Sequence, residues 1–303
     1  MELRHLRYFV AVAEEKSLTK AAARLYIAQP PLSRQIKELE ETIGVPLFLR
    51  RPRGMELTSG GEYFLEQARQ ILDKVDTAVT DTRHISQNRK TLFSIGFVPS
   101  VFYGQLPLMV RRLRSNKNLE IMLHELKTRE QIDALKSGKI DIGLGRVRID
   151  DPDVEQVMLF DEPLIAALPA GHDLTLNPPT MAELANYPMV AFPATTGPNF
   201  ADLTLNLFHQ KGLKVNVIQQ VNDIQTALAL VASEMGFTLV PEQVRNLHRD
   251  GVKYMPLADN SITTPVIVSR RRGENPNAVM RLTLTILNEL VENRFAGRYP
   301  LHQ

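Results

Sequence analysis

The chain has 303 residues, with 36 Lys and Arg against 34 Asp and Glu, and it contains no cysteine. That length suits a small domain followed by a larger one, and the missing cysteine excludes a disulfide framework and thiolate chemistry. No apolar run is long enough to span a bilayer, and the first residues lack the apolar core of a signal peptide. We therefore expect a cytoplasmic protein with no membrane partner.

The first 45 residues predict three short helices. Apolar residues recur at helical spacing between positions 3 and 13, which indicates a first helix. Ser17 is a good N-cap for a second helix over residues 18–25, and a third helix is expected to begin near Gln29. Pro30 and Pro31 fit its first turn, where backbone N–H groups have no helical acceptor. This order is typical of a helix-turn-helix.

The third predicted helix has an apolar face and a polar face. The apolar stripe consists of Leu32, Ile36 and Leu39. The opposite face carries residue types that hydrogen-bond base edges and phosphates, namely Gln29, Ser33, Arg34 and Lys37. Residues 45–58 then predict two short strands around a basic tip with Arg50, Arg51 and Arg53, a wing suited to a minor groove or to flanking phosphates.

The distribution of charge favours DNA over the alternative, in which these arginines only form a solvated surface. Residues 1–58 contain 10 Lys and Arg and 7 Asp and Glu, a net charge of +3, whereas the whole chain has +2 and the remainder therefore −1. The basic excess lies in the small domain, as expected if that part alone meets phosphate.

A long helix is predicted from about residue 61 to residue 90. Apolar or small side chains are spaced alternately four and three residues apart, at Phe64, Ala68, Ile71, Val75, Ala78, Thr82 and Ile85. Such a heptad seam favours pairing with a second copy of the helix. The alternative is that this face packs on its own domain. A dimer would place two copies of the third predicted helix symmetrically on a DNA duplex that contains an inverted repeat.

Residues 91–303 alternate strand-like apolar runs with helical patterns, which predicts an α/β domain with mostly parallel strands. Two such sets, joined by strands that cross near residues 161 and 265, predict two lobes. We place lobe I at about residues 91–161 and 266–303, and lobe II at about residues 162–265. A cleft between two lobes is a common ligand site.

Polar side chains follow several predicted strands of this domain. Ser100 follows the strand over residues 92–98, and Thr128 follows the next strand with Gln131 three residues later, a capping-box pattern. Asn199 opens a helix in lobe II, and Arg146 ends another strand and adds a positive charge. Helix N-termini and cations favour anions, so these groups predict a small carboxylate ligand. For each residue alone, ordinary helix capping is the competing interpretation.

Other function classes find little support in the sequence. The seven histidines are scattered without metal-ligand spacing, and neither a Gly-x-Ser-x-Gly motif nor a phosphate-binding glycine loop is present. Asp141, Asp161 and Glu162 are read as strand-end and hinge residues, not as an acid/base pair. We expect no catalytic residue, metal or cofactor. A solute-binding protein would need a signal peptide, and an N-terminal DNA-reading helix argues against that class.

Residues 1–58 resemble the N-terminal domain of the LysR-type transcriptional regulators. The resemblance rests on residues 3–9, 17–25, 28–36, 39–40 and 47–58, and the segments 1–9 and 29–31 are similar to the subgroup that controls catechol and benzoate degradation. It implies a winged helix-turn-helix α+β domain (1–58), a linker and dimerisation helix (59–90) and a two-lobe α/β effector domain like that of periplasmic binding proteins (91–303).

The resemblance also implies a function and its residues. It implies an activator of an aromatic-acid degradation operon that responds to cis,cis-muconate, with chloromuconate, benzoate or another aromatic acid as alternatives. DNA contacts would come from Gln29, Pro30, Pro31, Ser33, Arg34, Lys37, Arg50, Arg51 and Arg53. Effector contacts would come from Ser100, Val101, Thr128, Arg146, Pro198, Asn199 and Phe200. Family members commonly form homotetramers, and RNA polymerase is the expected protein partner.

Overall fold

The computed structural model describes residues 1–51, 54–88, 90–194 and 198–295. The chain divides into an N-terminal unit of residues 1–87 and a C-terminal unit that comprises most of residues 88–303.

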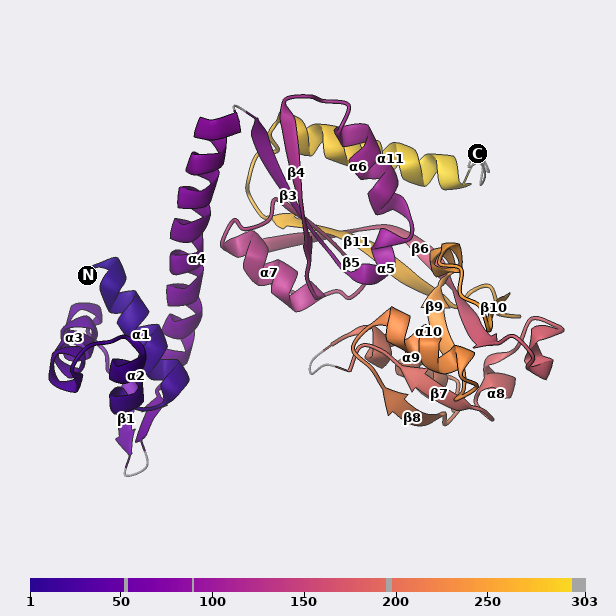
Figure 1. The fold of residues 1–303 in the computed structure, drawn as a ribbon, viewed down its shortest axis with the longest axis horizontal. Helices are drawn as coiled ribbons and strands as arrows, with labels where there is room; N and C mark the ends of the chain where they lie inside the picture. Colours follow the sequence, from indigo (N-terminus) through magenta and orange to yellow (C-terminus); the bar gives the residue numbers. More distant parts are fainter. Residues whose placement is uncertain (52–53, 89, 195–197, 296–303) are drawn as a thin grey trace. The chain divides into compact units, whose positions relative to one another are not determined.

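The N-terminal unit contains the predicted helix-turn-helix, wing and long helix (Figure 1). Its elements are α1 (Leu3–Glu15), α2 (Leu18–Arg24), α3 (Gln29–Ile43), β1 (Phe48–Arg51), β2 (Gly54–Leu57) and α4 (Ser59–Asn88). The Ser17 hydroxyl accepts a hydrogen bond from the Lys20 N–H at 3.4 Å, as the N-cap prediction requires. The core joins all of these elements, since the Phe9 ring lies 5.2 Å from that of Phe48 and 5.1 Å from that of Phe64.

The predicted heptad seam of α4 has two parts. Ala68 is fully buried, and Phe64 packs against the core of the N-terminal unit, so the first two seam positions follow the alternative interpretation. Ile71, the next seam position, is 41 % exposed, and the later seam position Ala78 is also exposed, whereas Val75 between them is half-buried. The second half of α4 therefore presents apolar side chains that its own unit does not cover. Because α4 packs on the helix-turn-helix, residues 59–87 belong to the same compact unit as residues 1–58.

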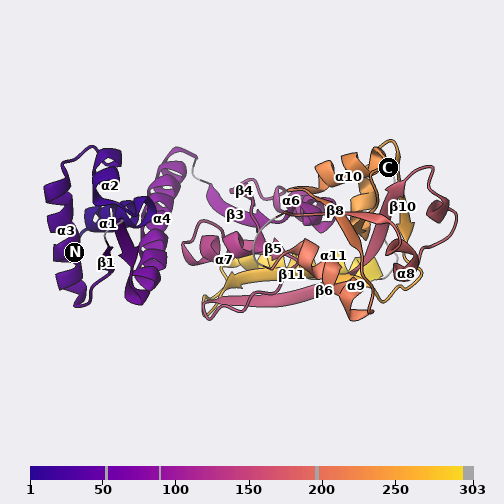
Figure 2. The ribbon, with the colours of Figure 1, turned by 90° about the horizontal axis from the view of Figure 1, so that it is seen from below.

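The C-terminal unit is built on a seven-stranded sheet with the order β10-β6-β11-β5-β3-β4, in which β9 also pairs with β6 (Figures 1 and 2). The strands are β3 (Thr91–Phe97), β4 (Leu119–Glu125), β5 (Ile142–Gly145), β6 (Val154–Pro169), β9 (Thr238–Pro241), β10 (Val252–Pro256) and β11 (Thr263–Arg271). A separate pair consists of β7 (Pro188–Ala191) and β8 (Asn216–Gln220).

The expectation of mostly parallel strands is wrong. Among the described residues, the named strands pair in parallel as β3 with β4, β3 with β5, and β7 with β8, and one isolated parallel bridge joins Met189 and Phe237, whereas β6 and β11 pair antiparallel with their partners. The reason is that two long strands run between the lobes in opposite directions. Asp161 pairs with Pro265 at the crossing, which is where the sequence placed it. Strand β10 was missed, because its five residues lack a clear apolar alternation.

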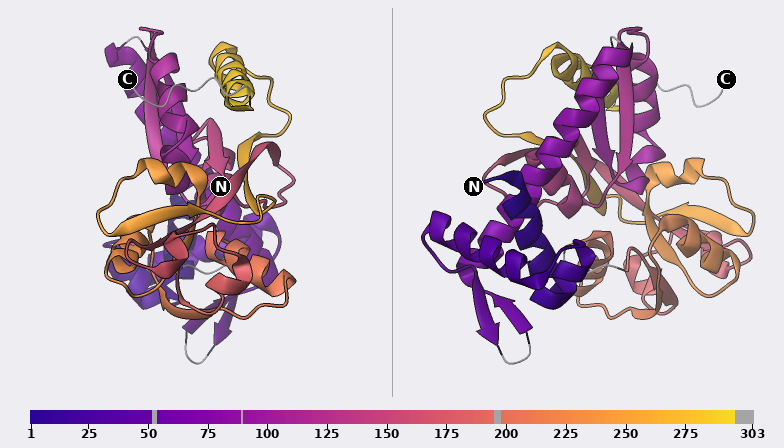
Figure 3. Two further views of the ribbon diagram at one scale, coloured as in Figure 1. Left: turned by 90° about the vertical axis from the view of Figure 1, so that its right-hand side faces the viewer. Right: turned by 60° about the vertical axis from the view of Figure 1, so that its left-hand side comes forward.

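The two lobes have separate hydrophobic cores. The core of lobe I includes Phe93, Ile95 and Leu287, and that of lobe II includes Phe208, Leu228 and Phe237. The helices are α5 (Pro99–Phe102), α6 (Gln105–Leu113), α7 (Thr128–Lys136), α8 (Met181–Leu184), α9 (Phe200–Gln210), α10 (Ile224–Ala232) and α11 (Ala278–Phe295), with 3₁₀ turns η1 (Asp173–Thr175) and η2 (Glu242–Asn246). The C-terminal helix α11, yellow in Figure 3, returns to lobe I and lies beside α6.

Candidate functional site

The exposed face of α3 is the first candidate site. Ala28 is the N-cap residue, and the prolines occupy the first turn as predicted. Since Leu32, Ile36 and Leu39 are buried in the core, the structure leaves the side chains of the opposite face accessible. The exposed residues of this face are Gln29, Pro30, Pro31, Arg34 and Lys37.

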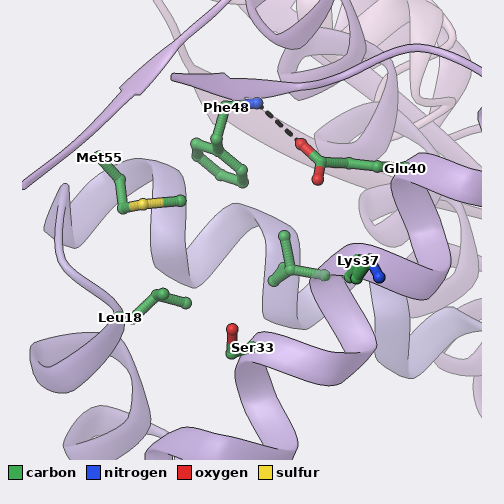
Figure 4. A pocket seen from close by; sticks show the side chains of 7 residues that line it. Leu18, Ser33, Lys37, Glu40, Phe48 and Met55 are labelled. Atoms are coloured by element: carbon green, nitrogen blue, oxygen red, sulfur yellow. Dashed lines mark hydrogen bonds between the residues drawn. The ribbon is translucent and has the colours of Figure 1, made fainter. Parts of the chain in front are cut away.

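Ser33 differs from the other predicted DNA contacts because it is only half exposed. It lines a small cavity of about 30 Å³ between α3 and the wing, with Glu40, Phe48 and Met55 among the other lining residues (Figure 4). A Glu40 side-chain oxygen accepts hydrogen bonds from the N–H groups of Leu47 at 2.8 Å and Phe48 at 3.0 Å. These bonds fix the start of the wing against α3, and the cavity has room for one water.

The basic side chains of this unit are accessible and partly paired. Arg51 forms an exposed ion pair with Glu56 at 3.0 Å, and Lys37 forms one with Glu41 at 3.5 Å. Exposed pairs of this kind contribute little free energy and exchange readily for phosphate. Within the described residues no ion pair involves Arg34. Arg53 and the side chain of Arg50 lie outside what the structure describes.

The second candidate site is a cavity of about 400 Å³ between the lobes of the C-terminal unit. That volume is typical of a site for a small molecule. Strand ends of lobe I form one wall, and the loops before α9 and α10 form the other. The structure brings six of the seven predicted effector residues to this lining, namely Ser100, Thr128, Arg146, Pro198, Asn199 and Phe200.

The seventh residue, Val101, does not line the cavity. Its side chain is 2 % exposed and packs in the core of lobe I. Its backbone N–H donates to the Val98 carbonyl oxygen at 3.0 Å. Val101 therefore stays a predicted effector contact that the cavity lining does not support, because its side chain follows the inward face of the short helix α5.

Arg146 lies at the base of the cavity in a buried network. Its Nε donates to the Ser100 hydroxyl at 2.7 Å, and its Nη2 pairs with the carboxylate of Glu162 at 2.5 Å. The side chains of Arg146 and Glu162 are only 3 % and 1 % exposed. The other carboxylate oxygen of Glu162 accepts from the backbone N–H of Gln243 in lobe II at 2.8 Å.

This network corrects the expectation that Arg146 brings a full positive charge to the cleft. Glu162 compensates the charge inside the same low-dielectric region. The sequence indicated a hinge role for Glu162 because an acidic residue interrupts an apolar strand there. It could not indicate the partner, since Arg146 directly follows β5 and Glu162 lies on β6, and only the folded sheet determines the distance between them.

The start of α7 also differs from its prediction. Lys127 precedes the helix, and its N–H donates to the Glu130 carboxylate at 2.9 Å, so the expected capping box between Thr128 and Gln131 is wrong. Gln131 is fully buried instead, and its amide donates to the carbonyl oxygens of Leu126 and Leu144. The Gln131 side chain thus ties α7 to the adjacent strand ends.

The helices of lobe II are capped by their own side chains. Asn199 accepts from the Asp202 N–H at 3.1 Å, and the Asp202 carboxylate accepts from the Asn199 N–H at 3.1 Å, which is a complete capping box on α9. Asp223 caps α10 by accepting from the Thr226 N–H at 2.8 Å. The competing interpretation, ordinary helix capping, therefore applies to the Asn199 side chain, although the residue lines the cavity.

The lobe II wall is consequently more apolar than the sequence suggested. The rings of Phe192 and Phe200 lie 5.3 Å apart at an interplanar angle of 38°, and both line the cavity. The charged lining residues are balanced in sign, with acidic Glu125, Glu130 and Asp223 against basic Lys127, Arg129 and Arg146. The cleft therefore combines two mutually tilted aromatic rings with a polar floor at Ser100, Thr128 and Arg146.

Within the described part of the chain, no group of three His, Asp or Glu side chains is arranged to hold a metal ion. None of its helices is both long enough and apolar enough to cross a membrane.

Both halves of the chain match known protein families. Residues 3–62 match the family of bacterial regulatory helix-turn-helix proteins of the lysR type, and residues 86–292 match the LysR substrate binding domain. The chain is 44 % identical to the transcriptional regulator CatR of Pseudomonas putida over 96 % of this chain and 100 % of that protein. It is 40 % identical to the regulator BenM of Acinetobacter baylyi over 94 % and 95 % of the two chains.

Solved structures show the same architecture. Full-length CbnR in complex with its target DNA is 28 % identical to this chain, with a TM-score of 0.69 and coverage of 96 % of this chain and 100 % of that one. The effector binding domain of BenM with its effector benzoate is 31 % identical, with a TM-score of 0.61 and coverage of 69 % and 94 %.

Proposed function

This chain belongs to the LysR family of transcriptional regulators, and from that membership we propose that it activates an aromatic-acid degradation operon when a small carboxylate binds between its two lobes. As a member of the family it is a DNA-binding regulator and not an enzyme. We propose its effector, its operator contacts, its oligomeric state and the roles of its domains.

The exposed face of α3 supports the proposed DNA contacts. Gln29, Pro30, Pro31 and Arg34 lie at the accessible start of the helix, where base edges would be read. Arg51 and Lys37 would exchange their exposed ion pairs for phosphate. Ser33, Arg50 and Arg53 remain proposed DNA contacts. The structure of CbnR with its target DNA shows that a protein of this architecture binds duplex DNA.

The single observation that best supports the effector is the cavity of about 400 Å³ with its polar floor and aromatic wall. A flat conjugated carboxylate would place its anionic end on Ser100, Thr128 and Arg146 and its carbon skeleton against Phe192 and Phe200. We propose cis,cis-muconate or a related acid. BenM, whose effector domain has been solved with benzoate, supports a small acid as the class.

The apolar half of α4 supports the proposed assembly. Ile71 and Ala78 are exposed positions of the predicted seam, which continues along this helix to residue 85. A second copy of α4 would cover these side chains and bring two α3 helices to one inverted repeat. We propose that residues 1–58 read DNA, residues 59–90 dimerise and residues 91–303 bind effector, with a homotetramer and contact with RNA polymerase as the complete assembly.

Calorimetric titration of the full chain tests the effector proposal. We expect saturable binding of cis,cis-muconate, little binding of succinate, and at least tenfold weaker muconate binding in Thr128→Ala. Thr180→Ala is the matched control, because Thr180 caps α8 away from the cavity lining. Binding of benzoate alone would reassign the effector. Binding of neither acid would refute the carboxylate proposal and leave the family membership unaffected.

A further inference from the structure

Tyr26 occupies the turn between α2 and α3 in an unusual conformation. Its backbone is left-handed, with φ 56°, and its side chain is 95 % exposed. The Tyr26 N–H donates to the Ala23 carbonyl oxygen at 3.2 Å, and the Ile27 N–H donates to that of Ala22 at 3.0 Å. These two bonds form a Schellman motif that ends α2, with Tyr26 in the position after the C-cap residue Leu25.

This position normally favours glycine or asparagine. A side chain with a Cβ is strained in the left-handed region, and tyrosine has no short polar group to offset that strain. Burial of the ring does not offset it either, because the ring is almost entirely exposed within the described part of the chain. Tyrosine therefore lowers the stability of this turn relative to glycine, so folding of this unit does not explain the residue.

The surroundings of Tyr26 indicate what its ring could contact. Every charged residue from position 16 to position 37 is basic, namely Lys16, Lys20, Arg24, Arg34 and Lys37, although Arg24 is paired with Glu14 and Glu15, and Lys37 with Glu41. Tyr26 lies three residues before Gln29, at the exposed start of α3. A tyrosine hydroxyl is a neutral donor that hydrogen-bonds phosphate oxygens, and contacts of this kind fix the position of a protein on a duplex.

We propose that Tyr26 is a DNA-positioning residue whose hydroxyl and ring contact the sugar-phosphate backbone beside the groove that α3 enters. The inference rests on DNA binding by this family and goes beyond the contacts proposed above. The left-handed backbone directs the ring away from the core, and the Schellman bonds hold that direction. Because the contact is with the backbone, it is independent of DNA sequence.

Binding of the full chain to two DNA duplexes tests the proposal. One is a random-sequence duplex at low salt, and the other is the duplex that the unaltered chain enriches from a randomised library. Tyr26→Asn should bind both about three- to tenfold more weakly, which is the value of one or two neutral hydrogen bonds. Its melting temperature should be equal or higher, because asparagine tolerates the left-handed conformation. The salt dependence should not change, because no charge is removed.

Two further variants complete the test. Tyr26→Phe keeps the ring and the fold and should show at least half of the loss if the hydroxyl contacts phosphate. Glu234→Asn is the matched control, since Glu234 also has a left-handed backbone, with φ 61°, but lies in the C-terminal unit. It should gain stability without weaker DNA binding. Affinity of Tyr26→Asn within twofold of the unaltered chain on both duplexes would refute the proposal, and a loss confined to the enriched duplex would refute contact with the backbone.

Discussion

Replacing Glu162 by glutamine should destabilise the C-terminal unit strongly. The Glu162 carboxylate is 1 % exposed and is bound both by Arg146 at 2.5 Å and by the Gln243 N–H at 2.8 Å. Glutamine can still accept from the Gln243 N–H, but it leaves the buried guanidinium without its counter-charge. Removing one partner of a buried pair costs about 3–5 kcal/mol. We therefore expect the free energy of unfolding to fall by about that amount.

The expected loss can be measured by urea denaturation of the full chain, followed by the near-ultraviolet circular dichroism of its tyrosines. Hydrogen exchange at the Gln243 amide reports the same region directly, because this N–H is bonded to Glu162. Glu155→Gln is the matched control, since Glu155 lies on the same strand and pairs with Arg270 at 2.7 Å in a partly exposed position. That pair should contribute less than about 1 kcal/mol.

The effector should restore part of the lost stability in Glu162→Gln. A ligand carboxylate on Arg146 would supply the missing negative charge, so binding to the variant should be tighter than binding to the unaltered chain. A ligand at one hundred times its dissociation constant adds about 2.7 kcal/mol. A loss below about 1 kcal/mol for Glu162→Gln would show that the buried pair is not held as the structure places it, and would refute this reasoning.

Three further predictions concern other parts of the chain. Arg34→Ala should cost about 1–3 kcal/mol on the enriched duplex and little on a random one if Arg34 contacts a base, and equal losses in a binding assay would make it a phosphate contact. Burial raises the pKa of Tyr254 from 10.0 to about 12, so stability should be complete below pH 10 and fall towards pH 12; Tyr254→Phe should remove this alkaline loss in pH-dependent melting. The hydrogen bond from Arg69 lowers the pKa of Glu14 below 4.5 despite partial burial. Ionised Glu14 should therefore stabilise the protein above pH 4.5, and this contribution should disappear as the pH falls further. In pH-dependent melting, Glu14→Gln should remove the part of the acid destabilisation that comes from Glu14.

The helix-turn-helix was predictable because its determinants are local. Helical spacing identified the buried stripe of α3, Ser17 identified the start of α2, and two prolines identified the start of α3. Each of these signals operates within a few residues, so it does not depend on the rest of the fold. The crossing near Asp161 and Pro265 was also predictable, because strand-like runs there separate two sets of alternating elements.

The tertiary structure alone decided how side chains are shared between elements. The sequence predicted that α4 packs either on its own domain or on a second copy of the helix. In the folded unit Ala68 packs on its own domain, whereas Ile71 stays exposed. Likewise, the predicted capping box between Thr128 and Gln131 does not form. The Glu130 carboxylate accepts from the N–H that precedes the helix, and the Gln131 amide, buried against the strand ends, donates to two carbonyl groups instead.

The sequence by itself determined the kind of protein: an N-terminal DNA-binding domain with a basic face, a long helix and a two-lobe domain with polar residues at its strand ends. It placed Ser100, Thr128, Arg146 and Asn199 at the cavity because strand ends of an α/β sheet converge by topology, and the family resemblance added Pro198 and Phe200. Only the tertiary structure decided the electrostatics of that cavity. The charge available from Arg146, which directly follows β5, depends on Glu162, which lies 16 residues later on β6. Such a pair is set by the packing of the sheet and not by local sequence.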